Sequence, residues 1–105
     1  MFGQMNTYFD RLGQRFVEAA RRRGASVQAP ELDAALSSEL LDLARVVAHG
    51  QERRYAPLAA YLAGLAAERL RQVDARADLA PFVREVREQL EAEAASAEVT
   101  EPGGC

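Results

Sequence analysis

Apolar residues recur along this chain at steps of three and four, the spacing that places side chains on one face of a helix. Four runs of this kind can be followed, and polar or charged residues fill the positions between their apolar members. The pattern predicts four amphipathic helices. Their apolar faces carry Phe9, Leu12 and Phe16; Leu36, Leu40, Leu43 and Val47; Leu58, Leu62 and Leu65; and Leu79, Phe82, Val83, Val86 and Leu90.

Glycine and proline separate these runs. The first run begins near Thr7 and is expected to end at Gly24, because glycine readily takes the left-handed conformation that follows a helix. Prolines at 30, 57 and 81 suit the first turn of the second, third and fourth helices, where a backbone N–H has no partner within the helix. The second helix is expected to end at Gly50, and Asp78 or Asp74 can cap the fourth.

No stretch alternates apolar and polar residues between hairpin signals, so strands are not expected. Helices joined by short loops predict an all-α fold, a small bundle of four mostly antiparallel helices, or five if Ser37 and Ser38 interrupt the second. Residues 1–95 are expected to form a single helical domain. The acidic, glycine-rich residues 96–105 are expected to be a disordered tail.

Composition narrows the classes of protein that fit this fold. The chain has 21 alanines and no tryptophan, and 16 acidic residues outnumber 13 arginines, giving a formal charge of -3. That balance argues against a general nucleic-acid binder, which usually presents a basic surface. The sequence contains no run of about 18 apolar residues, the length that a helix needs to span a membrane. The lone Cys105 and the absence of a leader-like N-terminus are compatible with the cytoplasm.

The chemical inventory is thin for an enzyme. One histidine and one cysteine stand far apart in the chain, and neither has a paired ligand at metal-binding spacing. Carboxylates that share helix faces, such as Glu39 with Asp42, are spaced as solvated surface acids. Pairs of Arg84 with Glu88 and of Arg87 with Glu91 are expected on the exposed face of the fourth helix. We therefore expect a non-catalytic protein without a metal or cofactor.

The turn between the second and third helices is the most informative segment. Its cationic side chains stand beside the start of a helix, whose N–H groups carry partial positive charge and favour anions. The alternative is structural, with these side chains capping helix ends or pairing with a nearby acid. Both readings concern the same candidate ligand-binding or partner-binding residues: His49, Arg53, Arg54 and Tyr55 in the turn, with Arg45 and Asp42 on the preceding helix.

The same segment resembles a family of short bacterial helical domains, found alone or fused to nucleotidyltransferases of the molybdenum-cofactor guanylyltransferase type. The resemblance implies a small helical fold and a connection with molybdenum-cofactor or formate-dehydrogenase maturation. It implies no catalytic residue, because the nucleotidyltransferase chemistry belongs to the fused domain. The matching residues are Leu41, Asp42, Leu43, Ala44, Arg45, Ala48, His49, Gly50, Arg53, Ala56, Pro57, Leu58, Leu62, Gly64, Leu65 and Ala66.

Three functions follow as hypotheses. The first is an accessory domain that binds a protein partner, a cofactor-maturation enzyme in particular, through the turn that carries His49, Arg53 and Tyr55. The second is an anion- or nucleotide-binding domain in which His49, Arg53 and Arg54 hold a phosphate. The third is a homo-oligomeric structural protein, with the third or fourth helix forming the interface of a homodimer.

Overall fold

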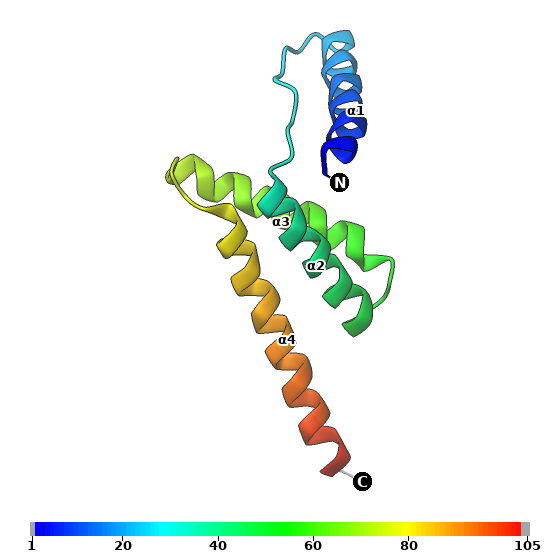
Figure 1. Cartoon of the computed structure of the whole chain (residues 1–105), viewed down its shortest axis with the longest axis vertical. Coiled ribbons are helices and arrows are strands. Elements are labelled where there is room, and N and C mark those ends of the chain that lie inside the picture. The colour runs from blue at the N-terminus through cyan, green and yellow to red at the C-terminus, as the bar shows by residue number, and fades with distance from the viewer. Residues whose placement is uncertain (1, 104–105) are drawn as a thin grey trace. The chain divides into compact units, whose positions relative to one another are not determined.

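A computed structural model describes the backbone of residues 2–103 and the side chains of residues 7–97. It contains four helices: α1 (Phe2–Arg22), α2 (Ala34–Gly50), α3 (Tyr55–Val73) and α4 (Leu79–Gly103) (Figure 1). No strand occurs in residues 2–103, so the predicted all-α class is confirmed. None of the described helices is both long and apolar enough to cross a membrane.

The chain forms two compact units, residues 1–34 with α1 and residues 35–105 with nearly all of α2 and the whole of α3 and α4. We call them the N-terminal unit and the C-terminal unit. The single domain expected over residues 1–95 stays a prediction. Helix α4 continues to Gly103, past the start of the expected tail, and Gly104 and Cys105 lie outside the described residues.

The end of α1 in the N-terminal unit has the geometry that the sequence predicted. Gly24 takes a φ of 82°, the left-handed region that only glycine enters without a steric cost. The Gly24 N–H donates to the Arg21 carbonyl, and the Ala25 N–H donates to the Ala20 carbonyl, both at 2.9 Å. These two bonds form a Schellman motif, which satisfies carbonyls that the helix leaves unpaired. Gly24 therefore ends α1 as expected.

The beginning of α2 differs from the prediction. The helix starts at Ala34 rather than at Pro30, so Pro30 and Glu31 belong to the segment before it. In the N-terminal unit Pro30 lies close against Gly13 of α1, where a Cβ on Gly13 would stand 3.1 Å from the Pro30 carbonyl oxygen. The proline thus packs on α1 instead of opening α2. Ser37 and Ser38 do not interrupt α2, which is continuous through both.

Helices α3 and α4 begin close to the predicted positions. Pro57 is the third residue of α3, which starts two residues earlier at Tyr55. Pro81 is likewise the third residue of α4, in its first turn as expected. Asp74 ends α3, and its carboxylate accepts a hydrogen bond from the Arg76 N–H at 3.2 Å within the loop that leads to α4. Both prolines occupy a first turn, where a missing N–H costs no helical hydrogen bond.

In the C-terminal unit, helix α4 runs in the same general direction as α2, while α3 crosses α2 (Figure 1). The expected antiparallel order is therefore not confirmed. Among residues 7–97, the buried apolar side chains all belong to this unit, and several of them are small: Leu43, Ala67, Leu79, Ala80 and Val83. Such a core removes little apolar surface per residue from water. Larger apolar side chains of the same unit, such as Leu58, Leu62 and Val86, remain exposed.

Candidate functional site

An apolar groove of about 240 Å³ opens in the C-terminal unit. All three helices of that unit contribute to it. Two of its residues are exposed to solvent, Leu62 to 67% and Val86 to 43%. Contiguous apolar surface that stays open to solvent is a common feature of interaction surfaces, which makes this groove the candidate site. The lining residues are Leu43 and Val47 of α2; Ala59, Leu62, Ala63 and Ala66 of α3; and Phe82, Val83, Val86 and Leu90 of α4.

The chemistry of the groove favours apolar side chains over a small polar ligand. Every lining side chain is hydrocarbon, so none donates or accepts a hydrogen bond. Sites for drug-sized ligands usually enclose about 300–1,000 Å³ and place a few polar groups to orient the ligand. This groove is smaller and has no polar side chain in its lining. A nucleotide or a pterin would find nothing there to bind its phosphate or ring nitrogens.

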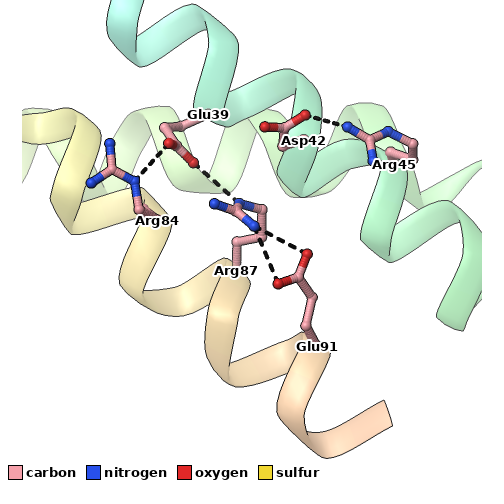
Figure 2. A network of polar contacts seen from close by, with 6 residues as sticks. All are labelled: Glu39, Asp42, Arg45, Arg84, Arg87 and Glu91. Atoms are coloured by element: carbon pink, nitrogen blue, oxygen red, sulfur yellow. Dashed lines mark hydrogen bonds and ion pairs between the residues drawn. The ribbon is translucent and has the colours of Figure 1, made fainter. Parts of the chain in front are cut away.

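A cluster of ion pairs joins α2 to α4, two of the helices that line the groove (Figure 2). Glu39 of α2 accepts a hydrogen bond from Arg84 Nε at 2.8 Å and another from Arg87 Nε at 3.1 Å. Arg87 also donates through Nη1 to both carboxylate oxygens of Glu91, at 3.2 and 3.1 Å. The Glu39 side chain is only 11% exposed and the Arg87 side chain 16%. The cluster therefore holds two groove walls through a nearly buried carboxylate.

The electrostatics of this cluster are structural in character. The hydrogen bond from Arg84 lowers the pKa of Glu39, and the hydrogen bond and charge of Arg87 lower it further, although burial acts in the opposite direction. The bond to Glu39 in turn raises the pKa of Arg87. A general acid or base works best with a pKa near the working pH. The pKa of Glu39 and the pKa of Arg87 are both shifted away from neutral pH, so each side chain stays charged there.

The environment of Glu39 differs from the prediction. Glu39 was expected among the solvated surface acids, whereas the whole residue is only 8% exposed. Arg84 was expected to pair with Glu88 but bonds Glu39, and of the two expected pairs on α4 that of Arg87 with Glu91 is confirmed. One signal pointed to the burial. Glu39 follows Leu36 by three residues and precedes Leu43 by four, which places it on the apolar face of α2.

The predicted turn residues lie together in sequence but on the surface of the C-terminal unit. His49, Arg53, Arg54 and Tyr55 are all exposed. Arg54 bonds Glu52 at 2.7 Å, and its guanidinium carbon stands 6.0 Å from the centre of the Tyr55 ring. Exposed contacts of this kind contribute little to stability. The turn thus has local contacts of its own.

The start of α3 offers fewer N–H groups than the sequence indicated. The Tyr55 N–H donates to the Glu52 carbonyl at 2.9 Å, and the Ala56 N–H donates to the Arg53 carbonyl at 3.1 Å. The next residue, Pro57, has no N–H. Most donors of the first turn are therefore already used or absent, which weakens the case for an anion at this helix end.

Asp42 and Arg45 form an ion pair with each other on α2 (Figure 2). Neither is among the residues that line the groove, and the same holds for the four turn residues. The structure therefore separates the predicted site from the apolar groove, and the binding role of the predicted residues stays a prediction. Among the described residues no group of three or more histidine, cysteine, aspartate or glutamate side chains could hold a metal ion.

No curated protein and no solved structure matches this chain. A family model described as a domain of unknown function, DUF6457, matches residues 5–99, which include most of both structural units. Because that match covers far more than half of its length, the chain belongs to the DUF6457 family of domains of unknown function.

Proposed function

We propose that this protein is a non-catalytic interaction module, and that its groove binds an amphipathic helix of a protein partner. The observation that carries this proposal is the exposure of Leu62 and Val86 within a lining made only of hydrocarbon side chains. Covering such a surface with the apolar face of another chain removes it from water, the main driving force of protein association. The size and chemistry of the groove support a protein side chain in preference to a nucleotide.

A helix is the form of partner that the walls fit best. The α4 wall presents Phe82, Val86 and Leu90 at steps of four, and the α3 wall presents Ala59, Ala63 and Ala66. Rows of this spacing pack against rows on another helix. The alanines allow close approach of its backbone. An amphipathic helix that places apolar side chains at steps of three and four would thus meet complementary rows on both walls.

For the identity of the partner, we propose an enzyme of molybdenum-cofactor or formate-dehydrogenase maturation. The support for this finer statement is the resemblance of the segment that runs through Asp42, His49 and Arg53 to domains fused to cofactor nucleotidyltransferases. The groove lies on the same helices as that segment, since Leu43 and Leu62 belong to both. In this proposal the partner supplies the chemistry, and the present chain supplies a docking surface.

Site-specific photo-crosslinking tests the proposal. A photoreactive amino acid replaces Leu62 in the groove, and in a control it replaces Leu41, which is similarly exposed at 61% but lies outside the groove. After irradiation in the native extract, mass spectrometry identifies the crosslinked peptide. We expect position 62, and not position 41, to crosslink to a helix of a cofactor-maturation enzyme, and the purified enzyme to bind wild-type protein but not the Leu62→Asp variant.

Two results would contradict the proposal. Equal crosslinking from both positions would show that the groove has no selective partner. A position-62 crosslink confined to a second copy of this chain would replace the partner helix with a homodimer. A crosslink from position 62 to a helix of an unrelated enzyme would support the docking function but contradict the connection with cofactor maturation.

A further inference from the structure

The α4 edge of the groove carries negative charge. Glu85 follows Phe82 by three residues and Glu93 follows Leu90 by three, so both carboxylates lie in the row next to the groove side chains of α4. Both are exposed. Within the described side chains, neither has a hydrogen bond or ion pair. Two unpartnered carboxylates therefore border the apolar lining on this helix.

The arginines of α4 do not neutralise that edge. Arg84 and Arg87 both reach toward Glu39 on α2, on the side where the two helices are joined (Figure 2). Arg87 is further occupied by Glu91. The positive charge of α4 is thus used inside the unit. Glu85 and Glu93 keep their negative charge at the groove edge, and residues 35–105 as a whole contain 12 acidic residues and eight arginines.

The α3 edge of the groove carries a positive charge, in contrast to the α4 edge. Arg69 follows Leu62 by seven residues and Ala66 by three, which places it on the same face of α3 as the groove lining. It is exposed, and within the described chain its side chain has no ionic partner. The groove is therefore bordered by carboxylates on one helix and by an arginine on another. Charges at the rim of an interface select the partner and its orientation, while the apolar centre supplies most of the affinity.

We propose that the partner helix has arginine or lysine residues along the edge that meets Glu85 and Glu93. This inference rests on the proposed docking function and adds the charge pattern of its ligand. The carboxylates hold the basic edge of the incoming helix against α4, and Arg69 disfavours a basic residue on the opposite edge. The groove then accepts an amphipathic helix in one rotational setting and rejects the same helix with acidic residues at the α4 edge.

Two synthetic helical peptides of equal length test the charge pattern. They share their leucine positions and differ only along one edge, which is arginine in the first peptide and glutamate in the second. Binding to the full-length protein is measured by fluorescence anisotropy at low salt. We expect the arginine-edged peptide to bind about three- to tenfold more tightly, the range expected for two exposed charge pairs. The preference should shrink as salt is added.

Matched variants assign the preference to the groove edge. The double variant Glu85→Gln, Glu93→Gln should lose the preference. The Glu88→Gln variant should keep it, because position 88 lies on the opposite face of α4. The Arg69→Gln variant should bind the arginine-edged peptide at least as tightly as the wild type does. Leu62→Asp should abolish binding of both peptides, and far-UV circular dichroism checks that this exposed substitution leaves the helices intact.

The outcomes separate the two proposals. Equal affinity of both peptides, with both lost in Leu62→Asp, overturns the charge pattern and leaves the docking groove in place. A preference that persists in the Glu85→Gln, Glu93→Gln variant also overturns the charge pattern. Binding that is insensitive to Leu62→Asp, or no binding of either peptide, overturns the docking function together with its charge pattern.

Discussion

The Nε atom of Arg84 lies 2.8 Å from Oε2 of Glu39, although 45 residues separate them in the chain. This bond joins α4 to α2, and the neighbouring bond from Arg87 repeats the connection at 3.1 Å. On the same two helices, Leu43 of the groove lining follows Glu39 by four residues, and Val83 directly precedes Arg84. The ion cluster thus fixes how far apart two groove walls stand. It makes the groove a feature of the folded unit and not of any one helix.

Glu39 should make the protein sensitive to acid. Its pKa is lower in the folded protein than its ordinary value, chiefly because of the hydrogen bond from Arg84. The stability that this carboxylate contributes is present above the pKa of the unfolded state, about 4.3 for glutamate, and is lost as the pH falls below it toward the folded value. We expect Glu39→Gln to lower the midpoint of thermal unfolding at pH 7 and to flatten its decline between pH 5 and pH 3.

Asp42→Asn is the matched control for that experiment. Asp42 also pairs with an arginine, but the pair lies on the exposed surface of a single helix. Such pairs contribute about 0.3–0.5 kcal/mol. A Glu39→Gln variant with the same acid profile as Asp42→Asn would contradict a stabilising role of the cluster.

Leu43 and Leu41 should respond very differently to truncation. Leu43 is 4% exposed, so Leu43→Ala removes a buried side chain and leaves a cavity, at a cost of about 2–5 kcal/mol. Leu41, two positions earlier on the same helix, points into solvent, and Leu41→Ala should change the free energy of unfolding by less than about 0.5 kcal/mol. Urea unfolding followed by circular dichroism measures both. Similar costs at the two positions would be incompatible with the burial of Leu43.

Two glycines at helix ends give a second matched pair. Gly24 has a left-handed φ, so Gly24→Ala should destabilise the end of α1 by about 1–2 kcal/mol. Gly50 is the last residue of α2, has no positive φ, and an added Cβ there would meet no atom within 4 Å. Gly50→Ala should therefore be neutral or stabilise α2 by up to about 1 kcal/mol. Amide hydrogen exchange resolves the two helices separately, and equal loss of protection in both variants would refute the distinction.

Phosphate should not bind specifically at the turn before α3. The first two N–H groups of α3 donate to backbone carbonyls, and the third residue is proline. We expect phosphate, molybdate, guanine nucleotides and pterins to leave the melting temperature unchanged within about 1 °C, in the wild type and in Arg53→Ala alike. A ligand-specific rise that disappears in Arg53→Ala would restore the anion-binding hypothesis for His49, Arg53 and Arg54.

The helices and several of their ends could be predicted from local sequence alone. Apolar spacing indicated each helix, and Gly24 identified the end of α1 because the left-handed conformation is a property of one residue and its neighbours. The start of α2 was wrong by four residues. Pro30 was as suitable for a helix start as Pro57, but it packs on Gly13 instead, a contact that no local rule anticipates.

The candidate site depended on tertiary structure. The sequence placed Leu43, Leu62 and Val86 on apolar faces. The spacing of residues does not determine how much of such a face another helix covers. The environment of Glu39 likewise depends on Arg84 and Arg87, which lie 45 and 48 residues further along the chain and donate hydrogen bonds to its carboxylate. By itself the sequence determined where helices form and which faces are apolar, because both follow from neighbours three and four residues away. Only the packing of α2, α3 and α4 decided which apolar side chains stay exposed and which charges meet, because these depend on contacts between distant segments.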